Sequence, residues 1–168
     1  TDYKNLPYDK YAERFDRKLS TYSKLTTESL SQAFLLKNPE LLHEHCSGWL
    51  LLKALELEMG GDSAAMKKVA KQYLIVQYIL DLSKMGGGKD PRAVLLPFFQ
   101  KLDDQERMEG LNDEVANFAA KIKARAKAKL KEQAEKKTFV GEDGKEYEYV
   151  ELSREERLGP GGLDPLEV

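Results

Sequence analysis

The sequence is poor in cysteine, histidine and long apolar stretches, and each shortage excludes a class of protein. With a single cysteine among 168 residues, Cys46, the chain can form no internal disulfide, which is typical of proteins of the reducing cytoplasm. One cysteine and two histidines fall short of the four ligands of a structural zinc site. The apolar stretch at residues 73–80 is too short to cross a membrane. We therefore expect a cytoplasmic protein with no metal, no cofactor and no membrane partner.

Motifs that carry catalysis are missing as well. In the sequence HEHC, His43 and Cys46 would share one face of a helix while His45 points away, so we interpret Cys46 as a buried side chain rather than a ligand. Residues 86–89 (GGGK) differ from a phosphate-binding loop, which needs a following Ser or Thr and a preceding strand. Neither a Ser–His–acid set nor carboxylates paired in an apolar setting are recognisable. We predict a non-enzyme without catalytic residues.

What the sequence does contain is helical periodicity over most of its length. Residues 62–85 are amphipathic in their first half and apolar nearly all round in their second, which predicts a helix in the middle of a bundle. Further helices are expected over residues 8–23, 26–36, 39–59 and 90–102, and from Asp103 or Asp104 onward. The predicted fold class is all-α, a bundle of about six helices whose long last helix projects beyond the others.

Charge is distributed unevenly although the formal net charge is only −2. Residues 121–137 hold eight Lys or Arg against two Glu, whereas residues 139–168 hold nine acids against three bases. The acidic segment could therefore fold back onto the basic helix. Four parts follow from these patterns: a helical bundle at 1–120, a projecting basic helix at 121–137, a β-hairpin at 138–152 with Asp-Gly at its turn, and a Gly/Pro-rich tail at 153–168. We interpret the chain as a fragment of a longer protein.

The basic helix leaves two alternatives open. Lys123, Lys127 and Lys131 could follow a phosphate backbone, as in a nucleic-acid-binding module. Charge runs on good helix formers are more often a solvated face, so we expect no nucleic-acid partner. The other alternative is an architectural scaffold, which would form a weak homodimer through the apolar seam that runs from Met108 to Ile122 or through the projecting helix.

Three stretches resemble one known family. They are QYILDL (77–82) followed by DPRA (90–93), FFQK (98–101) with MEGLNDE (108–114), and RLGPGGLDP (157–165). Together they are similar to the middle domain and the start of the C-terminal region of the cell-division-cycle 37 family, the kinase-targeting co-chaperone of the ninety-kilodalton heat-shock protein. The resemblance implies an all-helical domain that binds this chaperone, slows its ATPase and helps to load and mature protein kinase clients. Regions absent from this sequence would make most of the kinase contacts.

The resemblance also implies two chaperone-binding places, the turn before the short second helix and the outer first turns of the central helix. In this sequence they correspond to Lys24, Leu25 and Thr27, and to Ala64, Ala65 and Lys68. The family has methionine where this chain has Lys24, arginine at Thr27, a larger apolar residue at Ala65 and glutamine at Lys68. Because apolar anchors and arginines dominate such contacts, we expect docking to shift from the chaperone's nucleotide domain towards its middle domain.

Overall fold

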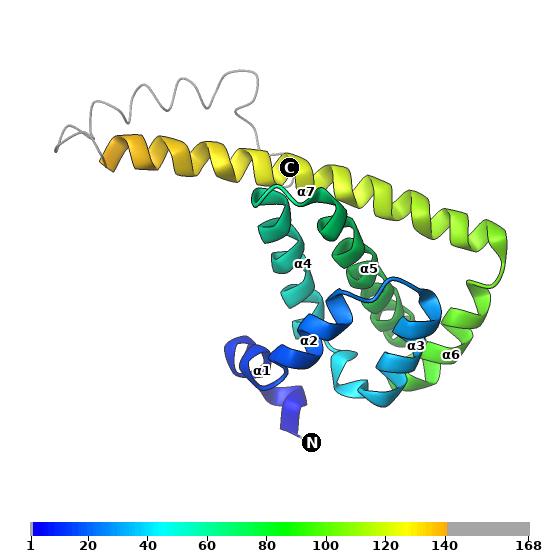
Figure 1. The fold of residues 1–168 in the computed structure, drawn as a ribbon. Helices are drawn as coiled ribbons and strands as arrows, with labels where there is room; N and C mark the ends of the chain where they lie inside the picture. The colour runs from blue at the N-terminus through cyan, green and yellow to red at the C-terminus, as the bar shows by residue number, and fades with distance from the viewer. Residues whose placement is uncertain (1, 141–168) are drawn as a thin grey trace.

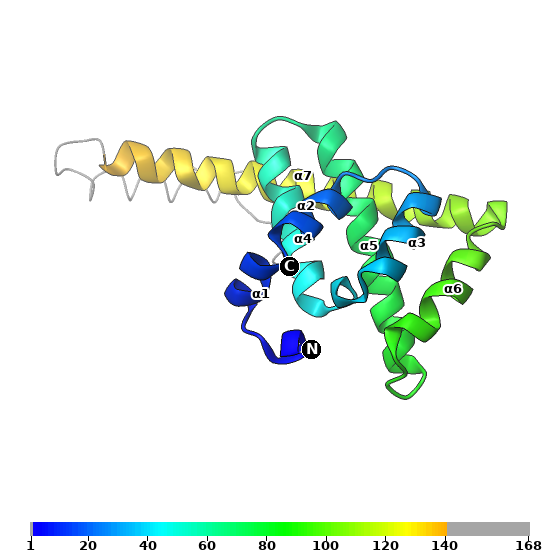
Figure 2. The same ribbon diagram turned by 60° about the horizontal axis from the view of Figure 1, so that its bottom comes forward.

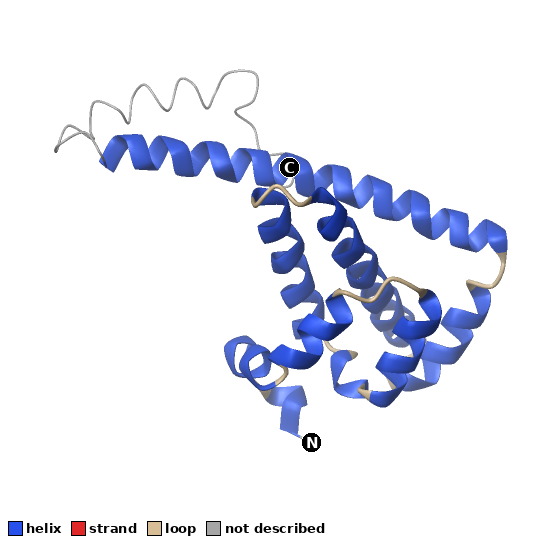
Figure 3. Ribbon diagram, in the orientation of Figure 1, coloured by secondary structure: helices blue, strands red, loops and turns tan. Residues whose placement is uncertain are grey.

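The structure is a computed structural model that describes residues 2–140, and within this range it is helical and contains no strand (Figure 3). Two short 3-10 helices are η1 (Asp2–Asn5) and η2 (Pro39–Leu41). The α-helices are α1 (Tyr8–Arg14), α2 (Asp16–Ser23), α3 (Glu28–Lys37), α4 (Glu44–Met59), α5 (Ser63–Met85), α6 (Pro91–Lys101) and α7 (Gln105–Val140). The all-α prediction is confirmed for the described part of the chain.

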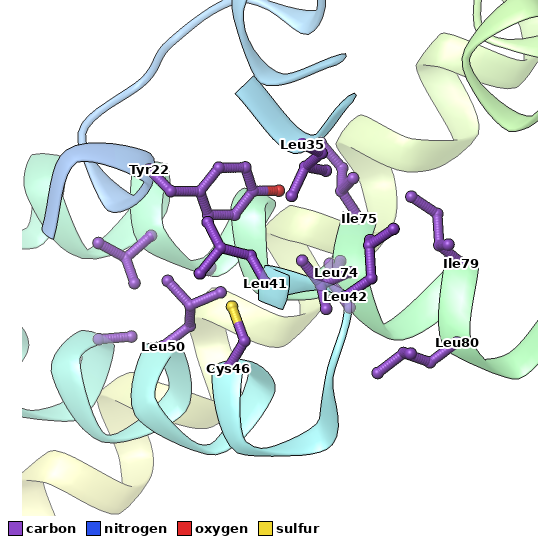
Figure 4. Packing of buried hydrophobic residues seen from close by; sticks show 14 of the residues in the cluster. Tyr22, Leu35, Leu41, Leu42, Cys46, Leu50, Leu74, Ile75, Ile79 and Leu80 are labelled. Carbon is purple, nitrogen blue, oxygen red and sulfur yellow. The ribbon is translucent and has the colours of Figure 1, made fainter. Parts of the chain in front are cut away.

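Helix α5 lies at the centre of the bundle, as its apolar second half predicts. It contacts α2, α4, α6 and α7 (Figure 1), and a helix covered on several sides must be apolar on several sides. Side chains from α2, α3, α4 and α5 converge on one core, seen in Figure 4 at Tyr22, Leu35, Leu50 and Ile75, all of which are fully buried. In the described part of the chain no helix, α5 included, is both long and apolar enough to span a membrane.

The connection between α4 and α5 fixes where α5 begins. Gly61 has a φ of +89°, a left-handed conformation that a side chain would disfavour. Asp62 then caps α5, because its Oδ1 accepts a hydrogen bond from the backbone N–H of Ala65 at 3.0 Å. The cap satisfies one of the unpaired N–H groups of the first helical turn and sets the direction in which that turn faces.

Two helices expected from the sequence are interrupted in the structure. The helix expected over residues 8–23 breaks at Phe15, whose backbone leaves the helical region at φ −106° and ψ 18°. The helix expected over residues 39–59 begins only at Glu44, because residues 39–41 form η2 and His43 is extended at φ −149° and ψ 150°. Both breaks lie where aromatic rings meet, since Tyr11 stacks on His43 with ring centroids 5.0 Å apart.

Helix α7 lies across α4 and α5 and then extends beyond them (Figures 1 and 2). The predicted seam packs on the core, and the Phe118 ring stacks on Tyr73 of α5 with centroids 4.9 Å apart. Packing continues past residue 120, since Ile122 and Ala126 are buried. The helix runs to Val140, so the strand expected over residues 138–140 is wrong. The rest of the predicted hairpin and the tail lie outside the described residues.

Candidate docking surface

The first predicted contact place is the turn between α2 and α3. Lys24 ends α2 and is exposed, whereas the Leu25 side chain is partly buried against the core. Thr27 begins α3, because its Oγ1 accepts a hydrogen bond from the backbone N–H of Leu30 at 3.1 Å. The Thr27 hydroxyl therefore caps α3, so this short side chain has a structural role at the position where the resemblance implies an arginine.

The second predicted place is the first two turns of α5. Ala64 and Lys68 are exposed and Ala65 is partly exposed, while the neighbouring Met66 and Val69 are buried in the core. This alternation follows from the helical period, which puts the core residues and the surface residues on opposite sides. Two alanines present little apolar area, so neither offers an anchoring side chain to a partner.

The two places belong to one surface, because buried polar contacts tie the α2–α3 turn to α5. The Gln72 amide Nε2 donates to the backbone oxygen of Tyr22 at 3.0 Å and lies 2.9 Å from Ser31 Oγ. Directly before Gln72 in α5, Lys71 pairs with Glu28, the first residue of α3. In both Figure 1 and Figure 2 the α2–α3 turn lies beside α5. We call this surface the docking face and define it as Lys24, Leu25, Thr27, Ala64, Ala65 and Lys68.

The docking face is basic and offers little apolar area. Lys24 is exposed at the end of α2, and Lys67 and Lys68 are exposed shortly after the two alanines at the start of α5. One large apolar side chain was missed by the sequence analysis: Leu30, one turn after Thr27, is 53% exposed. The only sequence signal was its place between two serines, on the side of α3 away from the buried Leu35. The surface can therefore attract an acidic partner, with Leu30 as a large exposed apolar side chain beside the partly buried Leu25.

The HEHC motif has a structural role. His43 caps α4, because its Nδ1 accepts from the backbone N–H of His45 at 2.9 Å, and His45 Nε2 lies 2.9 Å from the backbone oxygen of Leu6. Cys46 is fully buried, and burial raises the pKa of its thiol far above the usual range. Within residues 2–140, His, Cys, Asp and Glu form no group of three or more that could hold a metal ion. The motif joins the N-terminal segment to α4.

Acidification is expected to weaken this junction. Burial lowers the pKa of His43 below its usual value of 6.5, while Lys4 O and Glu44 partly oppose the shift and His45 adds to it. The unfolded chain therefore binds the proton first, so the contribution of His43 is complete above about pH 6.5 and is lost as the pH falls. Protonated Nδ1 cannot accept from His45 N–H, and the lost cap is worth about 1 kcal/mol. Urea unfolding at pH 7 and pH 5.5 measures this loss.

The control for this pH dependence is His43→Asn, which keeps a capping acceptor that does not titrate in this range. The variant should show a smaller loss of stability on acidification than the parent chain. An equal loss in both proteins would assign the effect to other groups.

Comparison with known proteins matches this sequence to one family. A family model described as the Cdc37 Hsp90 binding domain matches residues 21–135, which include the whole docking face. The chain is 37% identical over 160 residues to a Gallus gallus protein named Hsp90 co-chaperone Cdc37, covering 94% of this chain and 37% of the relative. Proteins of the same name are 36% identical over 160 residues in Homo sapiens (94% and 39%) and 34% identical over 152 residues in Drosophila melanogaster (88% and 35%). The chain thus spans well under half the length of these relatives.

Proposed function

Since the chain belongs to the Cdc37 family, we propose that it is the chaperone-binding part of a co-chaperone adaptor for Hsp90. In this role it binds Hsp90, slows ATP hydrolysis by the chaperone and helps to load and mature protein kinase clients in the cytoplasm. The match of residues 21–135 to an Hsp90-binding domain carries the proposal. The chain itself is proposed to perform no chemistry, because its relatives are named as co-chaperones, its two histidines bond to the backbone and Cys46 is buried.

The chemistry of the docking face supports a weak contact with the nucleotide domain and a main contact elsewhere, for which we propose the middle domain of Hsp90. Lys24 and Lys68 are exposed cations where the resemblance implies methionine and glutamine, and Ala65 is small where it implies a larger apolar side chain. Exposed charges contribute through long-range attraction and little through burial. Loss of an apolar anchor removes the part of an interface that usually carries most of the binding energy.

Leu30→Asp is expected to weaken the remaining contact between the docking face and the nucleotide domain about tenfold. Leu30 is 53% exposed beside Thr27 and is the large apolar side chain that a partner would cover there, and each 1.4 kcal/mol corresponds to a factor of ten. Isothermal titration of the variant against the isolated nucleotide domain measures the loss. Leu96→Asp, which changes an exposed leucine of α6, is the matched control and should leave the affinity unchanged.

Binding and ATPase measurements test the proposed function as a whole. Adding the chain to full-length Hsp90 should slow steady-state ATP hydrolysis in a dose-dependent way, with a half-effect near the dissociation constant found by titration. A chaperone inhibitor that abolishes all ATPase defines the background rate. An unchanged ATPase, together with no detectable binding to any Hsp90 domain, would contradict the proposal.

A further inference from the structure

An apolar groove lies between α4 and α7. It has a volume of about 400 Å³. The apolar residues that line it are Leu51, Leu52, Leu55, Phe118 and Ile122. Leu51 is 37% exposed and Leu52 is 57% exposed, so the groove presents apolar area to solvent.

The α7 side of this groove ends in positive charge. Arg125 and Lys129 follow Phe118 and Ile122 on the same face of α7, at helical spacing, and both line the groove. They belong to the basic stretch of residues 121–137, in which eight Lys or Arg stand against two Glu. The groove therefore combines an apolar floor with a basic end, and its natural occupant is a segment that alternates apolar and acidic side chains.

The chain contains such a segment directly after α7. Residues 146–152 read EYEYVEL, so acids alternate with Tyr147 and Tyr149, and residues 139–168 together hold nine acids against three bases. The chain length between the end of α7 and this segment is also suitable for reaching the groove. From Lys129 to Val140 the helix rises about 17 Å at 1.5 Å per residue, and an extended chain recovers this length in about five residues. A chain that turned back after Val140 would thus bring residues 146–152 to the groove.

We propose that the groove between α4 and α7 is the docking site for this chain's own acidic segment, residues 141–168. The Tyr147 and Tyr149 rings cover Leu52 and its neighbours, and the flanking glutamates pair with Arg125 and Lys129. Tethering favours this occupant over a separate molecule, because a short linker gives an effective concentration in the millimolar range. Tyrosine suits the site, since its ring is apolar and its hydroxyl stays in water. The contact requires nothing of the chaperone, so it stands independently of the proposed function.

A spin label on the acidic segment tests this contact in the full chain. Ser153→Cys provides the attachment site, because Cys46 is fully buried and does not compete for the reagent. The methyl signals of Leu51, Leu52 and Leu55 should broaden at low salt, whereas those of Leu35 in the core should broaden far less. The broadening should fall several-fold in 1 M salt, where charges are screened within about 3 Å.

Two charge-reversal pairs make the test specific. The pair Arg125→Glu and Lys129→Glu should abolish most of the broadening, while Lys123→Glu with Lys127→Glu, which changes the same net charge on the exposed side of α7, should retain most of it. Circular dichroism checks that each variant is folded. Equal loss with both pairs, or no broadening in the parent chain, would overturn the proposal. So would equal broadening in a mixture of spin-labelled and isotope-labelled chains, because that result assigns the groove to a second copy.

Discussion

Lys24→Met combined with Ala65→Leu is expected to raise the affinity of this chain for the isolated nucleotide domain of Hsp90 about a hundredfold. Both positions belong to the docking face, where Lys24 is exposed and Ala65 partly exposed, so the new side chains fit without disturbing the core. Each restores an apolar group at a position where the family resemblance implies one. An anchoring side chain is worth about 1–3 kcal/mol, and 1.4 kcal/mol is a factor of ten. Isothermal titration of parent and variant gives the ratio directly.

A gain of binding is a strong test, because a misfolded variant cannot produce it. The matched control is Ala116→Leu with Lys123→Met, which adds the same two side chains at exposed positions of α7. This control should bind as the parent does. If the control variant gains as much affinity, the effect is non-specific hydrophobic binding. If neither gains, the docking face is not a contact for the nucleotide domain. Thr27→Arg is better tested separately, because it removes the cap of α3 and about 1 kcal/mol of stability.

Gln72→Ala is expected to lower the free energy of unfolding by about 2–3 kcal/mol. Gln72 is fully buried and its amide bonds to Tyr22 O and Ser31 Oγ, so the change removes two hydrogen bonds of about 1 kcal/mol each and leaves a cavity. The loss stays moderate because Tyr22 O still accepts from Leu25 N–H at 3.2 Å and is not left unpaired. Urea unfolding followed by circular dichroism measures the change.

The same substitution should loosen the docking face, because Gln72 ties the α2–α3 turn to α5. Amide hydrogen exchange should become faster at residues 22–27 than in the parent chain, because the Gln72 side chain bonds to Tyr22 and Ser31. The change at α6 should be smaller. Gln77→Ala is the control, since Gln77 is on the same helix, is only partly buried, and its Nε2 donates to Asp81 Oδ1 of the same helix at 3.3 Å. A cost for Gln77→Ala as large as that for Gln72→Ala would contradict this role.

The helices could be predicted from sequence wherever local signals decide them. The apolar second half of α5 and the glycines and Asp62 before it are local, and the structure has the helix at nearly the predicted bounds. The breaks at Phe15 and His43 could not be predicted, because they depend on the packing of Tyr11, Phe15 and His43 rings from separate segments. Helix propensity also carries α7 through residues 138–140, although Thr, Phe and Val favour strands.

The docking face was predicted by resemblance and not by residue chemistry. Its residues have no pattern of their own, since Lys24 and Thr27 look like an ordinary helix junction and Ala64 like an ordinary first turn. The contacts that hold it together, from Gln72 to Tyr22 and from Lys71 to Glu28, span long stretches of sequence and are visible only in the fold. Leu30 was missed for the same reason, because only the packing of α3 reveals which of its leucines is exposed.

The most direct test of the proposed docking is a titration of isotope-labelled chain with the isolated nucleotide and middle domains of Hsp90. The account predicts tighter binding and larger chemical-shift changes with the middle domain, and only small changes at the docking face with the nucleotide domain. Large shifts at residues 24–27 and 64–68 with the nucleotide domain alone, and none with the middle domain, would contradict it.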